Sequence, residues 1–122
     1  MNITITVRGI DEKEAEKNSN SVKNYTENAL KKLEGFLEKE QQPVYIDVVV
    51  TVVHPHPNHS VEVRVREPRY HFVAERSGPE LYKVIDDVMD IAYSEAIKHK
   101  NKFVDERRRE GHEEKVKSRS IK

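Results

Sequence analysis

The sequence predicts a single α+β domain in which two amphipathic helices pack on one face of a four-stranded, mixed sheet. Four segments are rich in β-branched residues and alternate, or run continuously, as strands do. Two other segments repeat apolar residues every three or four positions, as helices do. In chain order these segments read β-α-β-β-β-α. At 122 residues the chain is long enough for one modest core.

The first two elements are a strand and a helix. Residues 2–7 alternate between apolar and polar, which indicates a half-buried strand. The polar run 11–21 is expected to be a loop with room for one helical turn, and Asn20 or Ser21 could cap the helix that follows. Beyond it apolar residues keep helical spacing until Pro43 ends the segment: Val22, Tyr25, Ala29, Leu30, Leu33, Phe36 and Leu37.

Three further strands follow. Residues 44–53 read VYIDVVVTVV and are nearly all apolar, which predicts a central strand covered on at least one face. The segment His54-Pro55-His56-Pro57 ends this strand, because proline cannot donate to a ladder. Residues 59–66 and 70–75 predict two more strands around a tight turn at 67–69. Since the first helix crosses over between the first two strands, these are parallel if adjacent.

The last element is a long helix. Residues 80–103 contain no Gly or Pro and carry one apolar stripe: Leu81, Ile85, Val88, Ala92, Ala96 and Phe103. Ser77 is expected to cap it, with Pro79 in its first turn. From residue 110 onwards the sequence lacks apolar content, and we expect a disordered polar tail over residues 110–122.

The net charge of zero hides an uneven distribution of charge along the chain. Residues 98–122 carry ten Lys/Arg and five Asp/Glu, a net of +5, whereas residues 1–97 carry twelve and seventeen, a net of −5. A cationic end of this kind is a candidate binding surface for a polyanion such as nucleic acid. The alternative is a merely solvated tail.

Composition excludes several classes of protein. Charged residues make up 36% of the chain, and no apolar run is long enough to span a membrane. The N-terminal residues lack the basic and apolar regions of a secretory signal. Zero cysteines exclude disulfides, thiolate metal sites and a thiol nucleophile. A cytoplasmic protein without a membrane partner is therefore expected.

Candidates for catalysis or metal binding are weak. The four glycines form no phosphate-binding loop, and no serine has a nucleophile-elbow context. Asp86 and Asp90 lie one helical turn apart and could bind a hard cation, or be solvated partners of nearby Lys and Arg. His54, His56 and His59 are the only metal-like group, without further ligands at a typical spacing. We expect no enzyme activity, no cofactor, no metal and no small-molecule substrate.

Basic residues outside the last helix could extend its cationic end into one patch: Lys31, Lys32, Arg64, Arg66, Arg69 and Arg76. Aromatic residues add little to such a patch, because Tyr70 and Phe72 alternate onto the expected core face. A base-stacking platform is therefore not expected. Recognition of a folded RNA through its phosphates and shape suits the composition better.

Three segments resemble a known family. Tyr25 followed by ALKKLE at 29–34 is similar to a Y…LxKLE run, and ELYKVID at 80–86 is similar to a [DE]-[ML]-Y-x-x-I-D motif. KHKNKF at 98–103 is similar to a KHKxKL ending at the same distance from the tyrosine. These motifs resemble those of the ribosome hibernation promoting factors and protein Y, also called sigma-54 modulation proteins. The resemblance covers about residues 2–103, with 11–21 as an apparent insertion.

The resemblance implies a ribosome-associated translation inhibitor that performs no chemistry. Such a factor binds the 30S subunit, alone or in the 70S ribosome, at the decoding region between head and body. There it sterically blocks mRNA and tRNA. On matching positions the resemblance implies contacts to 16S ribosomal RNA by Lys32, Lys98, His99, Lys100 and Lys102, to which the basic strand adds Arg64 and Arg66.

The chain departs from the family pattern in two ways. Ile91 and Ser94 stand where many members have Lys or Arg, so part of the expected patch is missing. Either ribosomal binding is weaker than usual, or Arg64, Arg66 and the arginines at 107–109 substitute. The chain is also too short for the second, dimerising domain of long members. It resembles a short form, and we expect it to be a monomer when free.

The prediction is thus a ribosome-binding domain over residues 1–109, similar in shape to a double-stranded-RNA-binding domain, followed by the tail. Two alternatives remain. One is another structured-RNA-binding module with no ribosomal role. The other is a regulator whose acidic half docks onto a protein partner.

Overall fold

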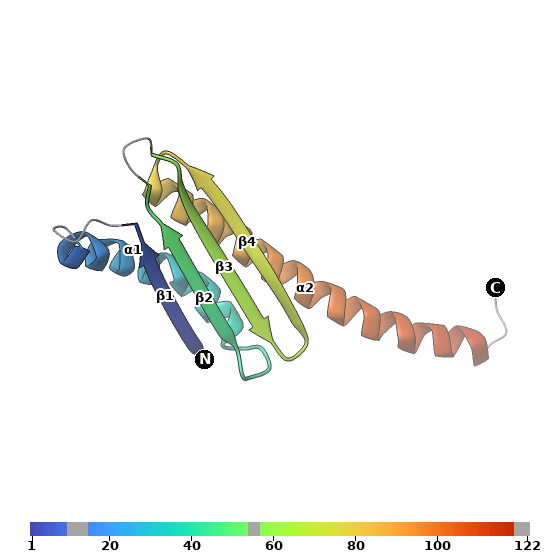
Figure 1. Cartoon of the computed structure of the whole chain (residues 1–122). Coiled ribbons are helices and arrows are strands. Elements are labelled where there is room, and N and C mark those ends of the chain that lie inside the picture. Colours follow the sequence, from blue (N-terminus) through green and yellow to red (C-terminus); the bar gives the residue numbers. More distant parts are fainter. Residues whose placement is uncertain (10–14, 54–56, 119–122) are drawn as a thin grey trace.

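The computed structural model describes residues 1–9, 15–53 and 57–118, with side chains for 1–9, 21–53 and 57–102. Its elements follow the predicted order β-α-β-β-β-α. They are β1 (Asn2–Arg8), α1 (Ala15–Leu37), β2 (Tyr45–Thr51), β3 (His59–Glu67), β4 (Tyr70–Gly78) and α2 (Leu81–Ser118). Figure 1 shows both helices on the same face of the sheet, with the last part of α2 extending beyond it.

The sheet has the order β1-β2-β3-β4, so β1 and β4 are its edges. β1 pairs parallel with β2, whereas β2–β3 and β3–β4 pair antiparallel. A parallel pair needs a crossover connection, and α1 supplies it. The predicted mixed sheet, its central second strand and the parallel first pair are all confirmed.

The core lies between the sheet and the helices. The alternate β2 and β3 valines that face the helices are fully buried, as are Ile85, Val88, Ala92 and Ala96 of the predicted α2 stripe. The centre of the α1 stripe is Leu30, Leu33 and Leu37, while Tyr25, Ala29 and Phe36 flank it, partly buried. Phe103 lies outside the described side chains. Neither helix, over its described residues, is long and apolar enough to cross a membrane.

The start of α1 differs from the prediction. The helix begins at Ala15, so residues 15–21 are helical and not a loop. Asn20 and Ser21 therefore lie within the helix, and the prediction that one of them caps it was wrong. These residues carry no apolar periodicity, which is why the pattern placed the start about two turns too late.

The ends of α2 differ as well. Ser77 belongs to β4 and pairs with Ser60 in the sheet, so it does not cap the helix. The carbonyl of Glu80 accepts the first helical hydrogen bond, from Val84 N at 2.9 Å, which makes Glu80 the cap and puts Pro79 before it. At the other end α2 continues to Ser118, so residues 110–118 are helical where a disordered tail was expected. Residues 119–122 lie outside the described part, and the domain boundary at 109 stays a prediction.

Candidate nucleic-acid interface

The seven predicted contact residues lie on two sides of the sheet. Lys32 belongs to α1, and Lys98, His99, Lys100 and Lys102 belong to α2, all on the helical side. Arg64 and Arg66 are on β3, exposed, and alternate with valines that are buried beneath the helices. The two arginines therefore lie on the open face of the sheet. The structure does not join them to the helical lysines in one patch.

On the open face, both arginines already have partners within the domain. Arg64 Nε lies 2.5 Å from Glu62 Oε1, and this hydrogen bond raises the pKa of the guanidinium. The Arg66 guanidinium lies over the ring of Tyr45, 5.2 Å from its centroid. Tyr45 and Arg66 are paired residues on neighbouring strands, so they form a small cation–aromatic unit at one end of this face.

Lys98 and Lys102 are the exposed cations of the predicted set on α2. They are four residues apart, so they lie on the same side of α2. The side chain of Lys98 is 77% exposed, with its ammonium 3.6 Å from Glu95, and Lys102 is also exposed. An exposed ion pair of this kind contributes little to stability and is readily exchanged for a phosphate.

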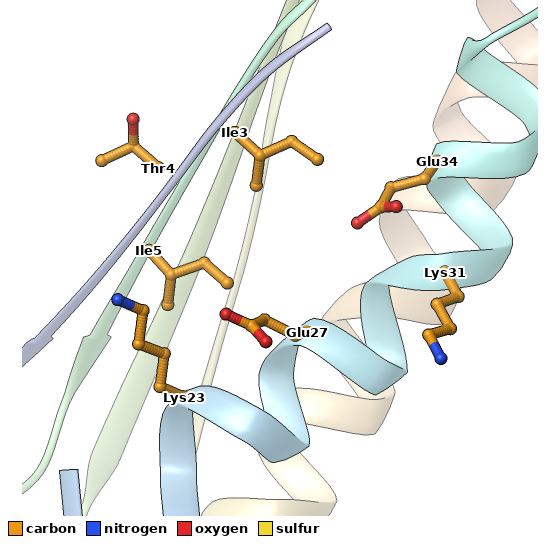
Figure 2. A pocket seen from close by; sticks show the side chains of 7 residues that line it. All are labelled: Ile3, Thr4, Ile5, Lys23, Glu27, Lys31 and Glu34. Carbon is orange, nitrogen blue, oxygen red and sulfur yellow. The ribbon is translucent and has the colours of Figure 1, made fainter. Parts of the chain in front are cut away.

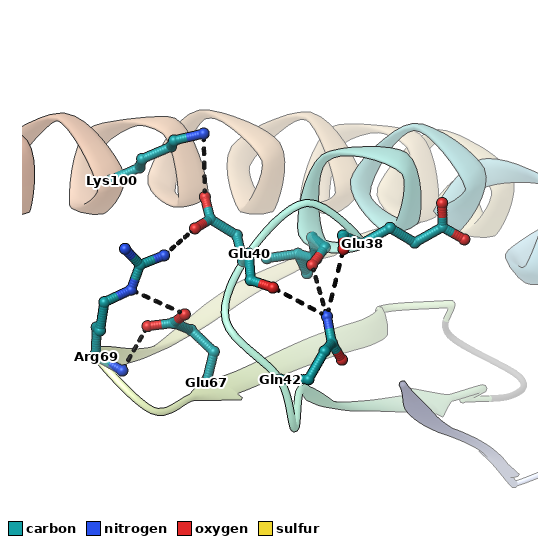
Figure 3. A network of polar contacts seen from close by, with 7 residues as sticks. Glu38, Glu40, Gln42, Glu67, Arg69 and Lys100 are labelled. Carbon is teal, nitrogen blue, oxygen red and sulfur yellow. Dashed lines mark hydrogen bonds and ion pairs between the residues drawn. The ribbon is translucent and has the colours of Figure 1, made fainter.

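Lys100 has a different environment, although it lies between these two in the sequence. Its ammonium is 3.6 Å from Glu40 Oε1 and 5.2 Å from the centroid of the Phe36 ring. Glu40 follows α1, and its side chain is only 1% exposed. Lys100 therefore attaches α2 to the segment after α1, as Figure 3 shows.

Glu40 is part of a larger buried ionic network. Its other carboxylate oxygen pairs with the Arg69 guanidinium, and Arg69 also contacts Glu67, whose side chain is fully buried. The Arg69 backbone N–H donates to Glu67 Oε1 at 2.5 Å, which closes the β3–β4 turn. Two buried carboxylates thus share two cations, one from the β3–β4 turn and one from α2 (Figure 3). Removing one cation would leave a carboxylate undercompensated.

His99 packs against the sheet. Its ring stacks on Tyr70 and Phe72 of β4, with centroid distances of 5.4 and 5.5 Å, and its Nε2 lies 3.7 Å from Glu95. Tyr70 is itself surrounded by negative charge. Burial, followed by the charges of Glu40 and Glu67, raises its pKa above the ordinary value. The contacts of His99 are those of a packing residue.

Aromatic rings and cations alternate along the seam between the helices. Lys32 Nζ lies 4.3 Å from the centroid of Tyr93, and Tyr93 meets Phe36 edge to face at 5.8 Å. Lys100 lies over the ring of Phe36. Sequence reasoning did not single out Tyr93, Phe36 or Glu40 as part of the site. Tyr93 and Lys100 are seven residues apart, a helical spacing that could have placed them on one side of α2.

The two positions where basic residues were expected differ in exposure. Ile91 is partly buried and packs against the core, whereas Ser94 is exposed. Arg107, Arg108 and Arg109 lie on the described helix, but their side chains do not belong to the described part.

Asp86 and His59, two of the residues considered for metal binding, have other partners. Asp86 accepts a hydrogen bond from the Tyr25 hydroxyl at 2.7 Å, which raises the pKa of Tyr25. His59 is buried, and its Nδ1 accepts from Val53 N at 3.0 Å. His54 and His56 lie outside the described residues. Among the residues that the structure describes, no group of His, Asp and Glu is arranged to hold a metal ion.

The chain is similar to known proteins in its sequence and in its fold. Residues 3–104 match the family described as sigma 54 modulation protein / S30EA ribosomal protein. The fold is similar to that of the N-terminal domain of protein Y from Thermus thermophilus, with a TM-score of 0.57 and 21% identity over 78% of this chain and 94% of that chain. It is also similar to a ribosomal subunit interface protein from Coxiella burnetii, with a TM-score of 0.60 and 21% identity over 83% and 99%. Comparison with curated proteins gives no match. Since the family match covers most of the chain, from β1 to residue 104 of α2, the chain belongs to the sigma 54 modulation protein / S30EA ribosomal protein family.

Proposed function

We propose that this protein is a ribosome-associated translation inhibitor that binds the 30S subunit at its decoding region and sterically blocks mRNA and tRNA. The observation that supports this most is the position of Lys98 and Lys102. Both are exposed on the same side of α2, within the residues that match the family. The interaction would be one of charge and shape, and inhibition would need no chemical step.

The helical face suits a phosphate backbone better than it suits bases. Lys98 and Lys102 offer mobile ammonium groups, which bind phosphate as point charges. Lys32 is held above Tyr93, so its cation stands at a defined place on the seam. Contacts of this type fix the position of a protein on an RNA without reading its sequence. We therefore propose 16S ribosomal RNA, in the free 30S subunit and in the 70S ribosome of the cytoplasm, as the partner.

Pelleting with purified subunits tests the proposal. The unmodified chain should sediment with 30S and 70S particles, and excess mRNA with tRNA should displace it. Lys98→Glu with Lys102→Glu should weaken binding at least about tenfold, because two cations become anions near phosphates. Arg76→Glu with Lys83→Glu makes the same charge change at two exposed positions on β4 and the first turn of α2, and should bind normally.

Other results would favour the alternatives. A chain that binds an unrelated RNA duplex as tightly as the 30S subunit would be a general structured-RNA-binding module. A chain that pellets with neither particle would point to a regulator that acts through a protein partner. Binding that persists when mRNA and tRNA fill the decoding region would contradict the steric mechanism.

A further inference from the structure

The outer edge of β1 is open in the described part of the chain. Asn2 N donates to Val44 O, and Arg8 O accepts from Val52 N, each at 2.9 Å, so the backbone groups of both residues face the β2 side. Backbone direction alternates along a strand. The N–H and C=O groups of Ile3, Ile5 and Val7 therefore point away from the sheet. They present the hydrogen-bonding pattern that another strand would need.

This edge also lacks the features that usually prevent strand addition. Between Asn2 and Val7 the sequence is NITITV, with five β-branched residues and no charge, proline or glycine. β4, the other edge strand, includes His71, Glu75 and Arg76. Natural edge strands are commonly protected by such charges, or by proline or a bulge. β1 has none of these over its first six residues.

A groove between β1 and α1 lies beside the open edge. Ile3 and Ile5 form its strand side, and Lys23, Glu27, Lys31 and Glu34 form its helix side. Ile3 is 40% exposed, high for an isoleucine on the helical face of a sheet. Figure 2 shows Lys23 and Glu27 extending towards β1 near Ile5, whereas Lys31 points away. An added strand would cover apolar side chains that α1 leaves accessible.

The charges along the groove indicate which strand fits. Lys23 and Glu27 are one helical turn apart and opposite in sign, so the same pair related by a two-fold axis is complementary to itself. The chain has no net charge at pH 7, so copies do not repel one another overall. We infer that β1 pairs antiparallel with β1 of a second copy, which joins two sheets into one of eight strands.

In one register of this dimer Ile3 lies opposite Val7 of the second copy, and Lys23 lies near Glu27 of the second copy. The apolar side chains of the two β1 strands then meet on the helical side of the joined sheet, where Ile3 becomes covered. This inference differs from the expectation of a free monomer. It is independent of the ribosome-binding proposal, because Lys98 and Lys102 belong to the other helix and stay accessible.

Sedimentation equilibrium of the full 122-residue chain at several concentrations tests the dimer. The unmodified chain should populate a dimer. Ile3→Lys should raise the dissociation constant at least about tenfold, because it puts one charge from each copy into the β1–β1 interface. Val73→Lys is the matched control. Val73 is 53% exposed on the other edge strand, so the same substitution there should leave the dimer unchanged. Circular dichroism should show both variants folded.

Charge exchange tests the register. Lys23→Glu should weaken the dimer, because two carboxylates then meet on each side of the axis. Lys23→Glu combined with Glu27→Lys restores the opposite signs and should restore dimerisation. A monomer at every concentration would overturn the inference. So would equal effects of Ile3→Lys and Val73→Lys, or a double variant that stays as weak as Lys23→Glu.

Discussion

Lys98, Lys100 and Lys102 are equivalent in the sequence pattern but not in their contacts. The sequence gives three lysines on a predicted helix, and all three were expected to be surface cations. The structure leaves Lys98 and Lys102 exposed and joins Lys100 to the buried carboxylate of Glu40. No local pattern could have shown this, because Glu40 is distant along the chain and its burial depends on how α1 ends against α2.

The first prediction separates positioning from direct contact. Lys100→Gln should destabilise the fold by about 1 kcal/mol, because Glu40 keeps only Arg69 as a partner. It should weaken 30S binding while leaving the slope of log affinity against log salt unchanged. Lys98→Gln should instead reduce that slope by about one, as the loss of one phosphate contact does. Lys100→Arg should restore binding. A reduced slope for Lys100→Gln would show that Lys100 contacts RNA itself.

The second prediction concerns Gly9, which follows β1 with a φ of 84°. A Cβ on Gly9 would lie 1.9 Å from the carbonyl oxygen of Val52, a backbone atom that cannot move aside cheaply. Gly9→Ala should therefore destabilise the fold by about 2 kcal/mol or more in urea unfolding. Gly35 in α1 has nothing within 4 Å of its Cβ position, so Gly35→Ala is the matched control. It should stabilise the fold, by up to about 1 kcal/mol.

The third prediction is the alkaline behaviour of Tyr70. Its pKa is raised in the folded chain, so above about pH 10 the unfolded chain loses this proton first and stability falls as pH rises further. Below the unfolded pKa the contribution is fully present. The Tyr70 hydroxyl is buried without a hydrogen-bond partner among the described residues. Tyr70→Phe should leave stability at pH 7 equal or higher and make the alkaline decline shallower in thermal melts between pH 8 and pH 11.

At the level of elements, the sequence predicted the order, the pairing and most of the core. It did so because the strands and the buried parts of both helices repeat with the periods of their structures. Prediction failed where a helix continues away from the core. Residues 15–21 and 110–118 are helical without an apolar stripe, so hydrophobic periodicity could not indicate them. It also failed at Ser77, which pairs in β4 where a cap was expected.

The fourth prediction tests the proposed boundary at residue 109. Residues 110–122 carry four basic and three acidic residues, so their net contribution to the field is small. Deleting them should leave both the melting temperature and 30S affinity nearly unchanged. The same pelleting assay checks it, with the Lys98→Glu and Lys102→Glu double variant as the reference for lost binding. A deletion that abolished binding would move the interface to the end of α2.

For the molecule as a whole, the separation of charge matters more than its sum. Residues 1–97 carry a net of −5 and residues 98–122 a net of +5, so the end of α2 can approach RNA while the rest is repelled. This polarity should orient the chain as it binds. The same composition also leaves the free chain without net repulsion between copies.

The fifth prediction follows from that polarity. If six or more phosphates are engaged, affinity for the 30S subunit should fall roughly 10³-fold over a fourfold increase in salt. Filter binding or pelleting across a salt series measures this. A nearly flat response would show that apolar or base contacts dominate, which the seam of Phe36 and Tyr93 would then have to supply.

The parallel pairing of β1 with β2 has a consequence for how the chain folds. Asn2 pairs with Tyr45, whereas Thr51 pairs with Ser60 and Glu67 with Tyr70, so the three later strands close short loops and β1 closes a long one. Closing a long loop costs more entropy and delays contact formation. β1 is synthesised before α1 and β2, so it can pair only after both of them have been made. Of the four strands of this sheet, the one that is made first is then the last to find its place.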